Sequence, residues 1–226
     1  MPLWMVALWL MFATVWTQLT RTTTLPGWLL TVLATLGGPV AYLIGEWEFY
    51  GMPLDISRGI LIPRADTEVL AERAIALTQA AGEGARVLDL CAGSGCVGLA
   101  VAKFAPGCRV VLADWSEEAV RVCKQNVRRS ELNSRVTCMR VNALEPPPPA
   151  LWDFDVIVSN PPYIPTGDLP GLEPSVRDYE PWTALDGGPD GLDFYRFIPG
   201  KWKNALRLGG SLLFEVGIGQ ADTVER

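Results

Sequence analysis

The 226-residue chain contains no histidine. This absence excludes Ser-His-Asp and Cys-His nucleophile systems, and it excludes metal sites built on imidazole ligands. The chain has five cysteines, an odd number, and none of them form a C-x-x-C pair, which argues against a disulfide framework and against a zinc site. We therefore expect free thiols in a cytoplasmic protein that holds no metal.

Charged side chains are also scarce, at 19% of the chain compared with the usual quarter or so. The formal net charge is −6. Proteins that bind nucleic acid through its phosphates usually carry a basic surplus. The charge balance thus favours a protein or small-molecule substrate and no direct contact with nucleic acid.

The charge deficit is concentrated at the N-terminus, where Arg21 is the only charged residue between Met1 and Gly45. Residues 1–20 and 22–45 each approach the roughly 20 apolar residues that span a bilayer. No basic region precedes the first stretch, which argues against a secretory signal, and prolines and glycines interrupt the second. We expect residues 1–38 to be an atypical apolar segment, either a poorly packed helical lead-in or a mistranslated start, with a membrane anchor as the alternative.

Residues 39–80 differ from the apolar N-terminal segment in their sequence pattern. Alternating apolar and polar residues predict a β-hairpin within Tyr42–Pro63, with turns at residues 51–53 and 57–59. A helix is predicted over Thr67–Gln79, capped by Asp66 or Thr67. Its expected buried residues are Val69, Leu70, Ala74 and Leu77.

Residues 81–226 alternate between short apolar runs and helical patterns. Strands are predicted at Arg86–Leu90, Arg109–Ala113, Val136–Val141, Phe154–Ser159 and Ser211–Val216. The helices between them are predicted at Val97–Phe104, after a cap at Ser116, and at Leu192–Leu206. Strands separated by such helices form a parallel sheet with right-handed crossovers. The fold class is therefore α/β, a doubly wound, mainly parallel Rossmann-like sheet.

A glycine-rich loop follows the first of these strands, in the run Asp89-Leu90-Cys91-Ala92-Gly93-Ser94-Gly95. Glycines at this place let a ligand approach the backbone closely. Gly93, Gly95 and Gly98 also match the spacing of a dinucleotide fingerprint. However, the Asp89 carboxylate would repel a phosphate and suits the ammonium group of an amino acid.

Asp114 ends the second strand, where an acid commonly accepts hydrogen bonds from two ribose hydroxyls. NAD and S-adenosylmethionine share that ribose. Asp114 alone therefore leaves both cofactors open.

The run Asn160-Pro161-Pro162-Tyr163 directly follows the fourth strand, at the sheet edge where such folds bind ligands. The Asn160 side chain offers both a donor and an acceptor, and Tyr163 offers a flat face for stacking. Pro161 restricts the loop, so that its carbonyl can point inward. These features suit a planar NH₂ group on an sp² carbon.

Together these motifs resemble the release-factor glutamine methyltransferases, the HemK/PrmC family of class I methyltransferases. Further segments extend the resemblance from about Pro39 to Gln220, among them Pro39–Gly45, Glu48–Gly51, Ile62–Arg64, Tyr179–Pro181, Gly187–Leu192 and Glu215–Gly217. The resemblance implies methyl transfer from S-adenosylmethionine to the side-chain amide nitrogen of a glutamine in a peptide chain release factor.

The resemblance also implies roles for individual residues. Substrate binding would fall to Asn160, Pro161, Pro162 and Tyr163, with Asn160, Pro161 and Tyr163 acting in catalysis. Cofactor binding would fall to Asp89, Cys91, Ala92, Gly93, Ser94, Gly95, Asp114, Asn142, Ala143 and Asn160. Arg64, Thr67 and Glu68 are expected to line the mouth of the site, Glu180 and Pro181 to shape a loop over the substrate, and Glu215 to close a hydrogen-bond network.

Three departures from the family pattern bear on these expectations. The family has a longer, charged N-terminal domain. It usually has an acid and an aromatic residue near the adenine, where this chain has Asn142 and Ala143, so that Asn142 can hydrogen-bond the adenine but Ala143 cannot stack. The family fold also continues past strand five, whereas this chain stops at Arg226. We therefore expect the strand Ser211–Val216 to be an apolar, aggregation-prone sheet edge.

Two other functions stay open on the sequence alone. A DNA adenine-N6 methyltransferase shares Asn-Pro-Pro-Tyr, although it has to flip a base and contact phosphates. An inactive relic, truncated or tethered to a membrane, would keep the fold without the activity.

Overall fold

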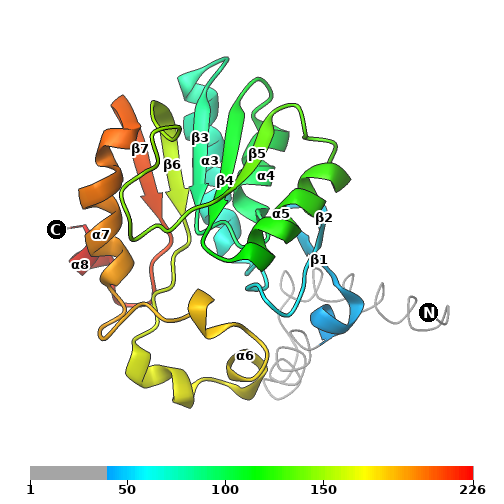
Figure 1. Cartoon of the computed structure of the whole chain (residues 1–226), viewed down its shortest axis with the longest axis vertical. Helices are drawn as coiled ribbons and strands as arrows, with labels where there is room; N and C mark the ends of the chain where they lie inside the picture. The colour runs from blue at the N-terminus through cyan, green and yellow to red at the C-terminus, as the bar shows by residue number, and fades with distance from the viewer. Residues whose placement is uncertain (1–39, 226) are drawn as a thin grey trace, which may run out of the picture. The chain divides into compact units, whose positions relative to one another are not determined.

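The computed structural model describes residues 40–225, coloured from blue to red in Figure 1. The predicted lead-in of residues 1–38 lies outside this range. Within the described residues, no helix is long and apolar enough to cross a membrane. The division between residues 39–80 and 81–226 stays a prediction.

A five-stranded sheet forms the centre of the fold, in the order β5-β4-β3-β6-β7 (Figure 1). All four pairings are parallel, as predicted. The strands are β3 (Arg86–Leu90), β4 (Arg109–Asp114), β5 (Val136–Arg140), β6 (Phe154–Ser159) and β7 (Leu206–Phe214). Because the strands run the same way, the loops that follow them meet at one edge.

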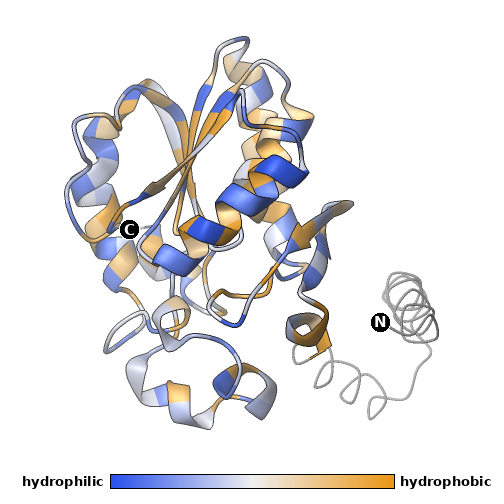
Figure 2. Cartoon of the chain, turned by 45° about the vertical axis from the view of Figure 1, so that its right-hand side comes forward, coloured by the Kyte–Doolittle hydropathy of each residue, from blue (hydrophilic) through white to orange (hydrophobic). Residues whose placement is uncertain are grey.

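Helices cover both faces of this sheet, which confirms the doubly wound arrangement. One apolar cluster joins the sheet to α3 (Thr67–Ala81), α4 (Cys96–Phe104) and α5 (Glu117–Arg129). A second cluster joins the opposite face to α7 (Asp193–Trp202), with Trp202 fully buried. Figure 2 shows the hydrophobic strands lying between helices whose outer surfaces are polar.

The predicted hairpin exists, but its limits were wrong. Residues 40–44 are helical, so Tyr42 does not begin a strand, and its hydroxyl donates to the Ile60 carbonyl over 2.6 Å. The hairpin pairs β1 (Glu46–Phe49) with β2 (Met52–Asp55). Its loop is Tyr50-Gly51, both with positive φ, the backbone that two-residue hairpin loops require.

Helix α3 begins at Thr67 as predicted, but its cap and its buried face differ from expectation. Asp66 occupies the N-cap position in a helical conformation, and its side chain makes no capping hydrogen bond. Val69 is exposed, and the buried apolar residues are Leu70, Ala71, Ala74 and Ile75. By contrast, Ser116 has the extended backbone of a true cap and accepts from Ala119 N over 3.3 Å, as predicted.

The C-terminal part of the sheet also differs in its boundaries. Helix α7 ends at Trp202, and a 3₁₀ turn over Lys203–Ala205 leads into β7, which begins at Leu206. A register shift interrupts the pairing of β7 with β6 early in the strand. In the described part of the chain β7 is an edge strand, as predicted, and Leu208 on it is fully exposed.

The exposed edge leads to a prediction about self-association. Leu208→Lys should reduce aggregation without lowering the melting temperature, because it replaces an exposed apolar side chain on β7 with a charge and removes no buried contact. Val69→Lys on α3 is the matched control, since it makes the same change in charge on an exposed helix position. Static light scattering across a concentration series checks this, and equal behaviour of the two variants would contradict it.

Candidate active site

The loop between β3 and α4 forms one wall of the site. Its backbone takes positive φ at Cys91, Gly93 and Gly95, the last of these being the N-cap of α4. Gly98 lies in the first turn of the helix, where an added Cβ would sit 2.3 Å from Leu112 Cδ2 and 3.0 Å from Asp89 Cβ. Only glycine therefore lets α4 pack this close to β3 and β4.

This close packing places Asp89 in an unusual environment. The carboxyl is almost completely buried, and its Oδ2 accepts from Gly98 N over 2.8 Å. Burial raises the pKa of Asp89 to about 7; the hydrogen bond from Gly98 opposes this shift, and the nearby Asp114 charge adds to it. A carboxyl in this state gains from a cationic partner.

Asp114, at the end of β4, holds the glycine loop in place. Its Oδ2 accepts from Gly93 N and its Oδ1 from Ser116 N, each over 2.9 Å. Burial still raises the pKa of Asp114, although these hydrogen bonds oppose the shift. Each carboxylate oxygen can accept more than one hydrogen bond, so both can still accept one from a ligand hydroxyl.

The Asn160 loop leaves the end of β6, the strand next to β3. Ser159 Oγ donates to the Leu90 carbonyl over 2.6 Å, which ties the two strand ends together. Asn160 Nδ2 donates to Thr67 Oγ1 over 3.3 Å, and Pro161 and Pro162 are buried. The Tyr163 carbonyl accepts from Gln220 Nε2 over 3.0 Å.

A cavity of about 440 Å³ lies between these loops, within the size range of small-molecule sites. Ten of the residues predicted for the site line it: Asp89, Cys91, Ala92, Gly93, Ser94, Asp114, Asn142, Ala143, Asn160 and Pro162. Gly95, Pro161 and Tyr163 do not line it. The structure thus brings the predicted cofactor residues together with Asn160, while two of the predicted substrate residues lie outside the cavity wall.

Asn142 reaches the cavity with its side chain already engaged. Its Oδ1 accepts from Leu144 N over 3.0 Å, and its Nδ2 donates to Glu145 Oε1 over 3.2 Å. The hydrogen bond predicted from Asn142 to an adenine must therefore compete with this turn. Ala143 is buried and adds only an apolar surface.

Several lining residues were not predicted, including Ile60, Leu61, Trp115 and Phe194. The sequence could have indicated Trp115, because it directly follows Asp114. Its ring is partly exposed, and the Arg140 guanidinium lies 4.7 Å from the ring centroid. No sequence pattern indicated Ile60 and Leu61, because they reach the site from a loop far away in the sequence.

The residues expected at the mouth of the site divide into two groups. Thr67 and Pro181 line the cavity. Glu68 does not, because its Oε1 accepts from Tyr50 N over 2.9 Å and so holds the hairpin loop. Arg64 does not line the cavity either, and forms an ion pair with the buried Glu180.

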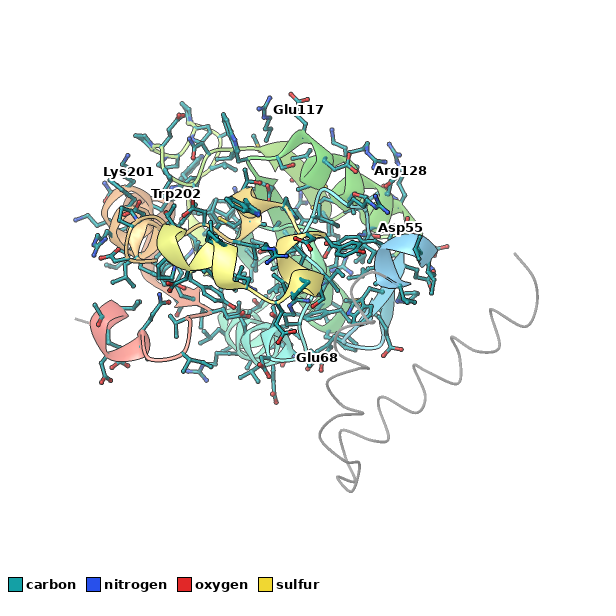
Figure 3. The ribbon with its side chains drawn as sticks, turned by 90° about the horizontal axis from the view of Figure 1, so that it is seen from below. Asp55, Glu68, Glu117, Arg128, Lys201 and Trp202 are labelled. Carbon is teal, nitrogen blue, oxygen red and sulfur yellow. The ribbon has the colours of Figure 1, made fainter. Side chains whose placement is uncertain are left out.

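The Arg64–Glu180 pair ties the segment after β2 to the segment of residues 166–184. This second segment, yellow to orange in Figure 1, runs below the carboxyl ends of the strands. Figure 3, seen from below, shows it in front of the sheet edge and Glu68 to its side on α3. Residues 166–184, called the cover segment below, contribute Pro181, Thr183 and Ala184 to the cavity wall. The Arg64–Glu180 ion pair joins this segment to the rest of the site.

The cavity suits S-adenosylmethionine in its distribution of polar groups. Asp89 is available for the ammonium group and Asp114 for the ribose, while Val97, Val141 and Ala143 provide an apolar wall. Ser94 Oγ is buried without a hydrogen-bond partner and also lines the cavity. An unpaired buried hydroxyl beside two carboxyl groups fits a polar ligand that completes its hydrogen bonding.

Over most of its length this chain is similar to known methyltransferases. A family described as "Methyltransferase small domain" matches residues 66–168. A release factor glutamine methyltransferase of Geobacter sulfurreducens is 47% identical over 188 residues, which are 82% of this chain and 63% of that protein. The enzyme of the same name from Clostridium acetobutylicum is 41% identical over 186 residues, 82% of this chain and 65% of that protein. The chain spans just under two thirds of the length of these relatives.

Among solved structures, the hMettl16 catalytic domain in complex with a MAT2A 3'UTR hairpin matches with a TM-score of 0.56 and 17% identity, covering 70% of this chain and 60% of that one. At this identity the match shows the fold alone. These comparisons confirm the predicted resemblance and the methyltransferase fold, and they imply S-adenosylmethionine as the methyl donor.

The raised pKa of Asp89 predicts how cofactor binding depends on pH. Affinity for S-adenosylmethionine should increase as the pH rises through about 7, because Asp89 must lose its proton before it can pair with the ammonium group. Asp89→Asn should bind S-adenosylmethionine weakly, and its affinity should not rise through this pH range. Titration calorimetry at several pH values checks the prediction, and parallel pH profiles for the two proteins would contradict it.

The same shift predicts a change in stability. Because the folded-state pKa is raised, Asp89 favours the folded state most at low pH, and this contribution is lost as the pH rises from the ordinary aspartate range to about 7. Asp89→Asn should remove this part of the pH dependence. Urea unfolding of both proteins without cofactor, at several pH values, measures the free energy of unfolding. If this free energy depends on pH in the variant as it does in the parent protein, the assignment is contradicted.

Proposed function

We propose that this chain, a homologue of release factor glutamine methyltransferases over most of its length, transfers a methyl group from S-adenosylmethionine to the side-chain amide nitrogen of a glutamine in a peptide chain release factor. The observation that carries the proposal is the position of Asn160. It lines the cofactor cavity at the end of β6, with its amide nitrogen held by Thr67.

The acceptor chemistry explains why this geometry is useful. An amide nitrogen is a poor nucleophile, because its lone pair is delocalised into the carbonyl. S-adenosylmethionine supplies an electrophilic methyl group when it is bound. The protein's task is then mainly to position the acceptor, an effect that can contribute about 7–11 kcal/mol in favourable cases.

Asn160 and Pro161 would do most of this positioning. With Nδ2 engaged by Thr67, the Oδ1 of Asn160 is left to accept one N–H of the substrate amide, and the Pro161 carbonyl accepts the other. The nitrogen gains positive charge as it is methylated, so acceptors directed at its protons stabilise the transition state. The methylated amide then loses its proton to water, without a strongly basic side chain.

Tyr163 and the cover segment would bind the rest of the substrate. Tyr163 is half-buried beside Asn160, and Pro181 and Thr183 bring the cover segment to the cavity.

The free thiols Cys91, Cys96, Cys108, Cys123 and Cys138 are consistent with a reducing compartment, and we place the reaction in the cytoplasm.

The DNA adenine methyltransferase alternative is not favoured. The net charge of −6 opposes a phosphate-binding surface, and the relatives that align over most of this chain carry the name of the protein-modifying enzymes. Radiolabelled S-adenosylmethionine, with release factor or duplex DNA as acceptor, separates the two functions. Cofactor binding without transfer to either acceptor would favour the inactive relic.

The role of Asn160 gives the decisive variant. Asn160→Ala should abolish methyl transfer to release factor while cofactor affinity stays within a few fold, because the side chain acts on the acceptor. Single-turnover kinetics and calorimetry measure the two effects separately. Asn204→Ala, an exposed asparagine after α7, is the control and should behave as the parent protein. Parallel loss of affinity and turnover in Asn160→Ala would refute this role.

A further inference from the structure

Glu215 lies beside Asn160 at the carboxyl edge of the sheet. Ser159 pairs with Phe214 in the β6–β7 register, and Glu215 N continues the ladder by donating to the Ser159 carbonyl over 3.0 Å. From α7, the Tyr195 hydroxyl donates to the Glu215 carbonyl over 2.8 Å. Hydrogen bonds from two sides thus fix the backbone of Glu215, and the bond to Ser159 places it beside Asn160.

The Glu215 side chain is less well satisfied than its backbone. Its Oε2 is buried and has no hydrogen-bond partner among the described residues. Burial raises the pKa of this carboxyl, and Thr67 and Asn160, which lie next to it, oppose the shift without satisfying Oε2.

This arrangement determines which way the Asn160 amide faces. An amide has an NH₂ donor side and a carbonyl acceptor side, whereas an ionised carboxylate only accepts. Turned the other way, the amide would place Oδ1 toward the Glu215 carboxylate, which has no proton to donate when ionised, whereas the Thr67 hydroxyl can donate or accept. The observed orientation, with Nδ2 on Thr67 Oγ1 over 3.3 Å, leaves Oδ1 free.

We propose that Glu215 is a positioning residue: its carboxylate, acting with Thr67, holds the amide of Asn160 so that Oδ1 faces the acceptor nitrogen. The inference rests on the proposed function for its catalytic consequence. The orientation of the amide itself does not depend on the substrate. Glu215 needs no contact with substrate or cofactor for this role.

The kinetic test compares Glu215→Ala and Glu215→Gln with the parent protein. Glu215→Ala should lower kcat for release factor by about tenfold or more, because the Asn160 amide is then free to turn and present its NH₂ side to the acceptor. KM and cofactor affinity should change little. Glu215→Gln should recover part of kcat, because its amide oxygen still accepts. Glu83→Gln, an exposed glutamate before β3, is the control and should match the parent protein.

A second measurement needs no activity. The side-chain ¹⁵N–¹H signals of Asn160, assigned by their loss in Asn160→Ala, should shift as Glu215 titrates above the usual glutamate range. The shift should vanish in Glu215→Gln. The other titratable or charged groups that act on or near Glu215 are Arg64, Asp66, Cys96, Tyr163 and Tyr195. Asp66→Asn should retain the shift.

The outcomes separate the two proposals. Unchanged kcat in Glu215→Ala, or an Asn160 signal with the same pH dependence in Glu215→Gln, overturns the positioning role. Equal loss of cofactor affinity and melting temperature in both Glu215 variants also overturns it, in favour of a structural role. If the parent protein leaves release factor unmethylated while the Asn160 signal responds to Glu215, the proposed function fails and the positioning role stands.

Discussion

The pairing of β3 with β6 is the constraint on which the site depends. Parallel pairing aligns Leu90 with Ser159, and the hydrogen bond from Ser159 Oγ to the Leu90 carbonyl joins the two strand ends. The glycine loop and the Asn160 loop, far apart in sequence, therefore begin side by side. One loop holds the groups suited to the cofactor and the other holds the amide suited to the acceptor. The cavity between them follows from this register.

The site gathers buried and half-buried carboxyl groups, and three of them, Asp89, Asp114 and Glu215, form no ion pair within residues 40–225. Burial raises the pKa of both Asp89 and Asp114, and of Glu215 on the acceptor side. Glu180 differs in forming an ion pair with Arg64, and burial raises its pKa as well. Such groups reduce stability at neutral pH when no ligand is present, and they cluster at functional sites. A cofactor that carries an ammonium and a sulfonium would relieve part of this cost.

The errors in the predicted elements have local causes. Tyr42 lies in an alternating pattern that resembles a strand, but its ring and hydroxyl are taken up by the loop at Ile60. Val69 was expected inside because helical spacing alone does not say which apolar stripe faces the sheet. Glu68 was expected at the mouth of the site, yet the tight Tyr50-Gly51 loop uses its carboxylate. For Tyr42 and Glu68, a contact distant in sequence overrode a local pattern.

The sequence by itself determined the parallel α/β sheet, the ends of β3 and β6, the glycine loop with Asp89 and Asp114, and the Asn160 loop. These features are local, because strands, caps and glycine turns depend on neighbouring residues. Only the tertiary structure decided that Ile60, Leu61 and Phe194 complete the cavity, that Arg64 pairs with Glu180, and that Glu215 stands beside Asn160. These contacts join segments whose separation in the chain carries no periodic signal, and they form only when the sheet brings the strand ends to one edge.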